Sequence, residues 1–309
     1  MSENAASRKP QVPILRCRIR SICVICVICG CSLLLTCLRL DSFLFDPIRV
    51  EGEYFNPAET DTSWHVRGDV IPDSLIEPVT LHGLDSNRVY GFFARQPNGA
   101  GRITVLYSHG RGENINRYWG RVELLWEAGY GVFIYDYEGY GKSEGAPSGA
   151  ACYADAEAAL GYVLARRDVV DSNVVYYAWS LGSFMACHLA ADNADKPRCL
   201  ILENPMASMS ALAKEGAVLG IPGSFLVDAD FDNEVRMPKL GCRTLIIYGK
   251  KDDTAVPERN AEVLLTAAKD QPDVTGYPVE GANHSDLPEV MGYGEYERVV
   301  KAFIAGDSL

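Results

Sequence analysis

The chain has 309 residues, of which 48% are hydrophobic and 23% charged, and its net charge is −12. This composition is ordinary for a globular protein, and the length allows one domain of about 230 residues with an N-terminal extension. Residues 1–40 carry a net charge of +5, which leaves −17 for residues 41–309. An acidic body repels phosphate backbones, so the charge excludes nucleic-acid binding.

The first predicted element is an uncharged stretch, Ser21 to Leu38, which is rich in Ile, Val, Leu and Cys and lies between two arginines. Its length is at the short end for a helix that crosses a bilayer. We therefore predict a basic cytoplasmic tail over 1–20 and a transmembrane signal anchor over 21–38. More basic residues precede the anchor than follow it, so the rest of the chain is expected on the non-cytoplasmic side of a single-pass membrane protein.

Two other interpretations of this leader remain open. A cleaved secretory peptide has a similar layout, although the sequence lacks a clear A-x-A cleavage site. The run Ile28-Cys-Gly-Cys31 is also similar to a bacterial lipobox, which would make the chain a lipoprotein. All three interpretations bring the chain to a membrane or export it.

The ten cysteines divide into two groups. Six of them, Cys17, Cys23, Cys26, Cys29, Cys31 and Cys37, lie in or beside the leader. We interpret them as small residues of an apolar helix or, alternatively, as S-acylation sites. Their spacing, without nearby histidines, is not that of a zinc site. The other four, Cys152, Cys187, Cys199 and Cys242, are predicted to be buried thiols. No metal site is expected.

Residues 39–78 are predicted to be a linker and lead-in, and the main domain is predicted over 79–309. Apolar runs predict eight strands near 79–84, 88–95, 103–108, 130–136, 173–179, 199–203, 243–248 and 274–279. Helical patterns fall at 118–128, 150–166, 181–192, 257–269 and 295–305. This alternation predicts a mostly parallel sheet with helices on both faces and an antiparallel hairpin at its start. The insertion at about 205–238 is rich in apolar residues and is interpreted as a short cap or as an ordinary crossover helix.

A serine stands at the end of one predicted strand. The run Val174–Tyr177 is followed by Ala178-Trp-Ser-Leu-Gly182 and then by a helical pattern. A strand, a tight turn and a helix form the context in which G-x-S-x-G exposes a serine nucleophile, here with Ala in place of the first Gly. We predict Ser180 as the nucleophile.

A serine hydroxyl needs a base, and the base needs an acid that orients it. His284 follows the last predicted strand and is the expected base. Two neighbouring carboxylates follow the strand before it. Counting from Gly249 favours Asp252, whereas counting back from Pro257 favours Asp253, and we expect Asp252 with Asp253 as the alternative.

The oxyanion that forms during acyl transfer needs two backbone N–H donors. One is expected from Leu181, directly after the nucleophile. The other is expected from Arg111, on the loop His109-Gly-Arg-Gly-Glu-Asn114 that follows an earlier strand. His109 comes too early in the chain to be the base, and we expect it to brace this loop.

Together with a second loop, Asp136-Tyr-Glu-Gly-Tyr-Gly-Lys-Ser-Glu-Gly145, these motifs resemble those of serine hydrolases with the α/β-hydrolase fold. The resemblance extends from about Val79 to the C-terminus and is greatest to small members with an H-G-x-x-x-N loop and a reduced cap. It implies acyl-transfer hydrolysis and a structural role for Asp136. Members of the family include membrane-anchored esterases, protein thioesterases and peptidases, so the substrate stays open.

The sequence thus predicts a membrane-tethered serine hydrolase that cleaves carboxylic ester or thioester bonds of small or lipid-like acyl substrates through an acyl-enzyme. No cofactor is expected, and the sequence does not disclose the oligomeric state. One alternative is a serine peptidase, which needs a carboxylate for the peptide's free amine; Glu113, Glu138 and Glu144 are candidates by loop position only. The other is a catalytically silent binding or scaffold protein, which the loss of a triad residue would have favoured.

Overall fold

The computed structural model describes residues 45–55, 70–97, 102–193, 197–209 and 231–309, all within the compact unit 41–309. The predicted basic tail, the predicted anchor over 21–38 and most of the predicted cap lie outside these residues. In the part of the chain that is described, no helix combines the length and the apolar character that crossing a membrane requires.

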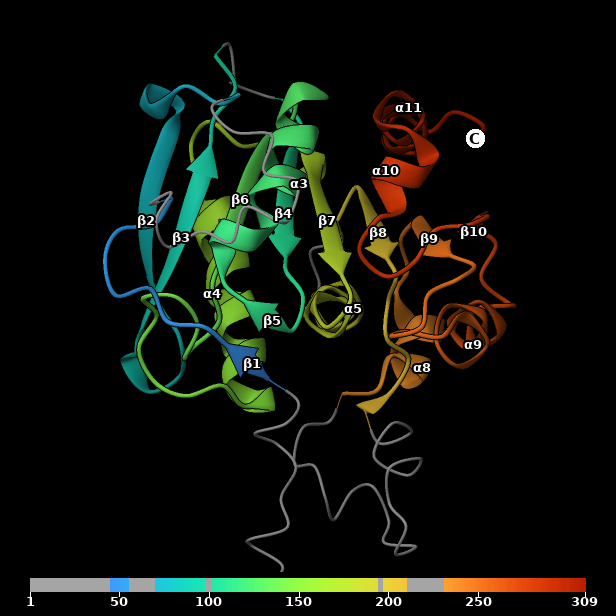
Figure 1. The fold of residues 1–309 in the computed structure, drawn as a ribbon, viewed down its shortest axis with the longest axis horizontal. Helices are drawn as coiled ribbons and strands as arrows, with labels where there is room; N and C mark the ends of the chain where they lie inside the picture. The colour runs from blue at the N-terminus through green and yellow to red at the C-terminus, as the bar shows by residue number, and fades with distance from the viewer. Residues whose placement is uncertain (1–44, 56–69, 98–101, 194–196, 210–230) are drawn as a thin grey trace, which may run out of the picture. The chain divides into compact units, whose positions relative to one another are not determined.

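The centre of the fold is an eight-stranded sheet with the strand order β10-β9-β8-β7-β4-β6-β3-β2 (Figure 1). Strand β2 pairs with β3, and β3 with β6, in antiparallel fashion, whereas the other neighbours are parallel. The mostly parallel sheet with an early antiparallel hairpin is therefore confirmed. The strand bounds are β2 (Ile76–His82), β3 (Arg88–Ala94), β4 (Thr104–Ser108), β6 (Gly131–Tyr135), β7 (Val174–Trp179), β8 (Cys199–Glu203), β9 (Thr244–Gly249) and β10 (Val274–Val279).

Helices cover both faces of the sheet, which explains why strands β4, β6, β7, β8 and β9 are buried along their whole length. Alternate residues of these strands pack into one apolar cluster with α3 (Ile115–Glu127) and α11 (Tyr293–Ala305). The opposite face contacts α4 (Gly149–Ala165) and α5 (Gly182–Asp192). The remaining described helices are α8 (Asn233–Arg236), α9 (Ala261–Ala267) and α10 (Leu287–Met291).

The structure differs from the expected elements in several places. Strand β2 begins at Ile76, before the predicted position 79, and the helical pattern over 257–269 divides into a 3-10 turn at Pro257–Arg259 and α9. A further two-stranded sheet joins β1 (Asp46–Pro47), within the predicted linker, to β5 (Gly112–Glu113). Two-residue strands have no hydrophobic period, so periodicity does not reveal them.

Candidate active site

Ser180 occupies a strained turn between β7 and α5. Its φ angle of 53° lies in the left-handed region, which residues other than glycine rarely adopt. Its backbone N–H donates to the carbonyl oxygen of Glu203 at 3.0 Å, which fixes the turn to the neighbouring strand. A Cβ at position 182 would lie 2.0 Å from the carbonyl oxygen of Ser108, so only glycine allows the start of α5 to approach β4 this closely. The turn presents the serine hydroxyl beyond the carboxyl end of the sheet.

The three residues predicted as a triad lie in one hydrogen-bonded line. Ser180 Oγ is 2.9 Å from His284 Nε2, and His284 Nδ1 is 2.7 Å from Asp252 Oδ2. The second carboxylate oxygen, Oδ1, accepts the backbone N–H groups of Thr254 at 2.9 Å and Ala255 at 2.7 Å. These two bonds fix the carboxylate while its other oxygen orients the imidazole.

The alternative acid, Asp253, has a different environment. Its side chain is exposed, its N–H donates to Asn283 Oδ1 at 3.1 Å, and its own Oδ1 accepts the Thr254 hydroxyl at 3.4 Å. Asp252 is buried and is the carboxylate that meets His284. The geometry therefore favours Asp252 as the orienting acid.

A residue that the sequence interpretation missed, Asn204, links the two loops that carry the acid and the base. It follows β8 with a φ of 42°. Its Nδ2 donates to the carbonyl oxygens of His284 at 2.8 Å and Asn283 at 3.3 Å, and its Oδ1 accepts the N–H of Gly249 at 2.8 Å. The Trp179 indole N–H also donates to the His284 carbonyl at 3.1 Å. The base is thus held from two neighbouring strands.

The predicted oxyanion donors lie on the two expected turns. His109 is fully buried, and its Nδ1 is 2.8 Å from the carbonyl oxygen of Gly110. In a trans peptide the carbonyl and the following N–H point in opposite directions, so this contact fixes the direction of the Arg111 N–H. The N–H groups of Arg111 and Leu181 have no hydrogen-bond acceptor among the described residues.

A buried network of charged and hydroxyl side chains holds the end of β8, the strand that neighbours β7. The carboxylate of Glu203 is fully buried and forms a double contact with the Arg121 guanidinium, whose Nε lies at 3.2 Å. The hydroxyls of Tyr177 and Tyr296 also donate to it, the latter at 3.0 Å. Burial, followed by the Glu203 charge, raises the pKa of both tyrosines well above its usual value, which keeps these donors protonated. A satisfied charge pair therefore holds the strand whose carbonyl binds the Ser180 N–H.

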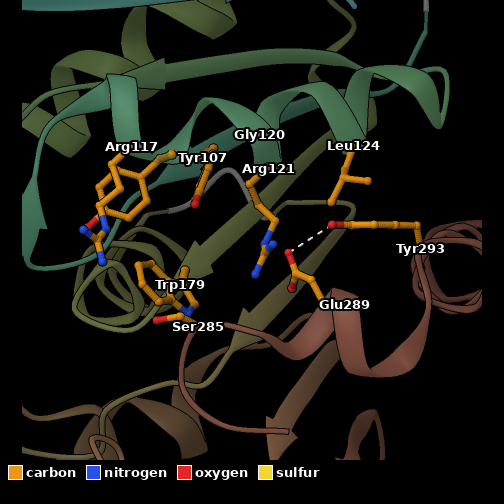
Figure 2. A pocket seen from close by; sticks show the side chains of 10 residues that line it. Tyr107, Arg117, Gly120, Arg121, Leu124, Trp179, Ser285, Glu289 and Tyr293 are labelled. Carbon is orange, nitrogen blue, oxygen red and sulfur yellow. Dashed lines mark hydrogen bonds between the residues drawn. The ribbon is translucent and has the colours of Figure 1, made fainter. Parts of the chain in front are cut away.

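A pocket open to solvent lies beside the triad and is lined by Trp179 and Ser285, the sequence neighbours of Ser180 and His284. Ser285 follows His284, and the Trp179 ring lies 5.1 Å from the imidazole. Figure 2 shows the pocket between α3 and α10, with Tyr293 hydrogen-bonded to Glu289 at 3.1 Å on its α10 side. Its lining residues are Tyr107, Arg117, Tyr118, Gly120, Arg121, Leu124, Trp179, Ser285, Glu289 and Tyr293.

The three carboxylates considered for binding a peptide amine have partners of their own. Glu113 forms an ion pair with Arg117, four residues further along the chain. Glu144 binds the Arg88 side chain, with its Oε1 2.9 Å from Nε. Glu138 is buried and accepts Asn87 Nδ2 at 2.9 Å. None of them lines the pocket beside the triad.

Within the described ranges, no cluster of three or more His, Cys, Asp or Glu side chains has the arrangement to hold a metal ion. Four cysteines lie outside the leader, in the described part of the chain. Cys152, Cys187 and Cys199 are buried, as expected, whereas Cys242 is only half-buried.

A protein-family profile and individual relatives indicate the same family. A protein-family profile described as "Serine aminopeptidase, S33" matches residues 99–234. The chain is 30% identical over 224 residues to human "Alpha/beta hydrolase domain-containing protein 17B", covering 71% of this chain and 72% of that protein. It is also 29% identical over 199 residues to "Uncharacterized protein YfhR" of Escherichia coli K12, covering 63% of this chain and 69% of the relative.

Solved structures share the fold at lower identity. The esterase Pf2001 of Pyrococcus furiosus superposes with a TM-score of 0.65 at 19% identity, over 84% of this chain and 98% of that one. Est1E of Butyrivibrio proteoclasticus, solved with ferulic acid bound, has a TM-score of 0.62 at 19% identity, over 74% of this chain and 99% of that one. At these identities the similarity is one of fold.

Proposed function

Because this chain belongs to the α/β-hydrolase family of serine hydrolases, we propose that it cleaves carboxylic ester or thioester bonds at Ser180. The observation that carries the proposal is the line from Ser180 Oγ through His284 to Asp252, with contacts of 2.9 and 2.7 Å. A serine next to an imidazole that is itself oriented by a carboxylate is the arrangement that activates a hydroxyl.

In the proposed reaction His284 takes the proton of Ser180 while Oγ attacks the substrate carbonyl carbon. The tetrahedral oxyanion accepts hydrogen bonds from the N–H groups of Leu181 and Arg111. His284 then gives its proton to the leaving oxygen or sulfur, which leaves an acyl-enzyme. Water, deprotonated by the same imidazole, attacks the acyl carbon and releases the acid together with a free serine.

The pocket in Figure 2 is the proposed site for the leaving group. The leaving atom receives its proton from His284, so the departing half of the substrate lies on the histidine side of the nucleophile. Two neighbours of the imidazole line this pocket. Ser285 follows His284 in the sequence, and the Trp179 ring lies beside the His284 ring. The walls of the pocket combine apolar surface from Tyr118, Leu124 and Tyr293 with the charged side chains of Arg117, Arg121 and Glu289. They suit an alcohol or thiol that carries both apolar and polar groups.

An ester or thioester substrate is favoured over a peptide with a free amine. An exopeptidase needs a carboxylate that faces the substrate amine, and the three candidates from the loops bind Arg117, Arg88 and Asn87 instead. Glu289 does line the pocket, where it accepts the Tyr293 hydroxyl at 3.1 Å, so the anilide substrates below test the peptidase alternative directly. A silent binding protein has no need of a histidine held between a serine and a buried carboxylate.

We also propose that the predicted anchor over 21–38 tethers the enzyme to a membrane, with the domain on the non-cytoplasmic side. Residues 39–44 separate this anchor from the first described residue, Phe45. Recovery of the full chain, but not of a chain starting at residue 41, in carbonate-washed membranes would support the tether, and equal recovery of both in the soluble fraction would contradict it.

The function is tested by turnover of a graded substrate set with the full-length protein and its Ser180→Ala variant. The set contains p-nitrophenyl esters from acetate to palmitate, an acyl thioester of a small thiol, and amino-acid p-nitroanilides. We expect Ser180-dependent cleavage of esters or thioesters and none of the anilides. Preferential cleavage of the anilides would make the chain a peptidase, and no turnover of any substrate would favour a binding protein.

A further inference from the structure

Residues 45–55, called the strap below, lie beside the loop that carries the proposed oxyanion donor. Figure 1 shows β1, at the start of the strap, alongside β5. The pairing is parallel, with Asp46 N–H donating to the Arg111 carbonyl at 3.4 Å and Ile48 N–H donating to the Glu113 carbonyl at 3.2 Å. The sequence Asp-Pro suits this position, because a residue before proline favours an extended backbone. Pro47 lacks an N–H, but the pairing uses only the N–H groups on either side of it.

The strap also binds the second glycine-rich loop, residues 136–145. The Arg49 guanidinium donates to the carbonyl oxygens of Ser143 and Gly145, the latter at 3.2 Å. The backbone of the strap and that of Gly141 exchange two bonds, Val50 N–H to the Gly141 carbonyl at 3.1 Å and Gly141 N–H to the Ile48 carbonyl at 3.0 Å. One short segment thus ties together two loops that belong to different strands of the sheet.

A third set of contacts reaches the beginning of α3. The Tyr54 hydroxyl donates to Asp136 Oδ2 at 2.7 Å, and Asp136 Oδ1 accepts the N–H of Ile115 at 2.9 Å. Asn114, which caps α3, donates from Nδ2 to the Ile48 carbonyl at 3.1 Å. The burial of Tyr54, followed by the Asp136 charge, raises the pKa of its hydroxyl far above the usual value, so it stays a donor.

These contacts fix the oxyanion loop through its carbonyl groups. The Arg111 carbonyl accepts the Tyr140 hydroxyl at 2.6 Å as well as the Asp46 N–H, and the Gly112 carbonyl accepts the Tyr118 hydroxyl at 2.6 Å. The Glu113 carbonyl has its donor from the strap. Because each peptide unit is planar, the fixed Arg111 carbonyl also fixes the Gly112 N–H. The Arg111 N–H belongs to the preceding peptide plane, whose Gly110 carbonyl contacts His109, so the strap holds this donor from the plane that follows it.

We propose that the strap is a positioning element of the active site, which holds the oxyanion loop in the orientation that points the Arg111 N–H at the substrate carbonyl. This role rests on the proposed function, since an oxyanion forms only if Ser180 attacks a carbonyl. The strap lies N-terminal to the first strand of the main sheet. A chain that begins at residue 79 keeps every triad residue and loses this support.

The test uses two full-length variants of one exposed residue. The Ile48 residue is 52% exposed, so replacing it removes little packing. Ile48→Pro deletes the N–H that binds the Glu113 carbonyl and keeps the Ile48 carbonyl that accepts Asn114 and Gly141. Ile48→Ala is the matched control, because it loses the same side chain and keeps the N–H. Ester turnover, the urea midpoint and amide hydrogen exchange of a peptide covering residues 109–116 are measured for both.

For Ile48→Pro we expect kcat to fall about tenfold, part of the 10²–10³-fold loss that follows removal of an oxyanion donor, with KM nearly unchanged. Exchange over 109–116 should rise, whereas the urea midpoint should stay as in Ile48→Ala. Equal kcat and equal exchange in the two variants would overturn the role of the strap. A parent that shows no turnover would defeat the proposed function alone, and the exchange measurement would still decide whether the strap orders the loop.

Discussion

Replacing Asp155 by asparagine should make the free energy of unfolding less dependent on pH. Asp155 is fully buried on α4, and its Oδ2 accepts the backbone N–H of Glu138 at 2.8 Å. Its Oδ1 and the Oε1 of Glu138 have no hydrogen-bond partner among the described residues. These two oxygens lie 2.1 and 3.0 Å from the point that a Cβ on Gly83 would occupy, so they converge on one buried spot.

Burial has the largest effect on the pKa of Asp155 and raises it. The hydrogen bond from the Glu138 N–H lowers this pKa, whereas the Glu138 charge raises it further. Together these effects raise the pKa from 3.8 to about 8. Between these values the folded chain keeps a proton that the unfolded chain has lost. Stability therefore falls as the pH rises through this window, by about 1.4 kcal/mol per pH unit. From pH 5 to pH 8 the loss from this one residue is about 4 kcal/mol.

Asparagine has no charge to bury, and its amide can donate where the protonated carboxyl would. Urea unfolding of wild type and Asp155→Asn at pH 5, 6, 7 and 8 measures the difference in unfolding free energy. The titration of groups that do not interact with Asp155 cancels in this difference; Glu138, whose charge affects the pKa of Asp155, is the exception. We expect the variant's relative stability to increase by about 4 kcal/mol across the series. A difference that is the same at every pH would refute the reasoning, because it would mean that Asp155 titrates alike in the folded and unfolded chains.

Further substitutions, at Asn204, at the two neighbouring aspartates and at Leu124, test the active site. Asn204→Ala releases the His284 loop from β8 and should lower kcat about tenfold with little change in KM, measured by steady-state ester hydrolysis. Asp252→Asn should lower kcat by about 10⁴, whereas Asp253→Asn should stay within about twofold of the parent in the same assay; the reverse order would exchange their roles. Leu124→Trp narrows the pocket and should raise KM about tenfold for esters of bulky alcohols, with methyl esters and Leu124→Met as controls.

The predictable part of the site follows the order of the strands. Ser180 and Asp252 come soon after the fully buried strands β7 and β9, and His284 follows the partly exposed β10. The carboxyl ends of parallel strands meet at one edge of the sheet. That rule places the residues in one region but does not choose between adjacent carboxylates. The choice between Asp252 and Asp253 rests on the N–H groups of Thr254 and Ala255, whose directions only the folded loop defines.

The parts that the sequence did not reveal depend on contacts between distant segments. Asn204 has no motif of its own, and an asparagine at a strand end is a weak signal of a left-handed residue that bonds two loops. The buried pair of Arg121 and Glu203 joins residues 82 positions apart. The strap consists of two paired residues and scattered polar bonds, so it has neither period nor composition to distinguish it from a linker.

Reaction of the full-length protein with a fluorophosphonate, followed by peptide mass spectrometry of the adduct, decides whether Ser180 is an activated nucleophile. We expect a single adduct on Ser180, formed rapidly by the parent and absent from Ser180→Ala. A folded parent that takes up no probe, or an adduct on another residue that persists in Ser180→Ala, would contradict this role of Ser180.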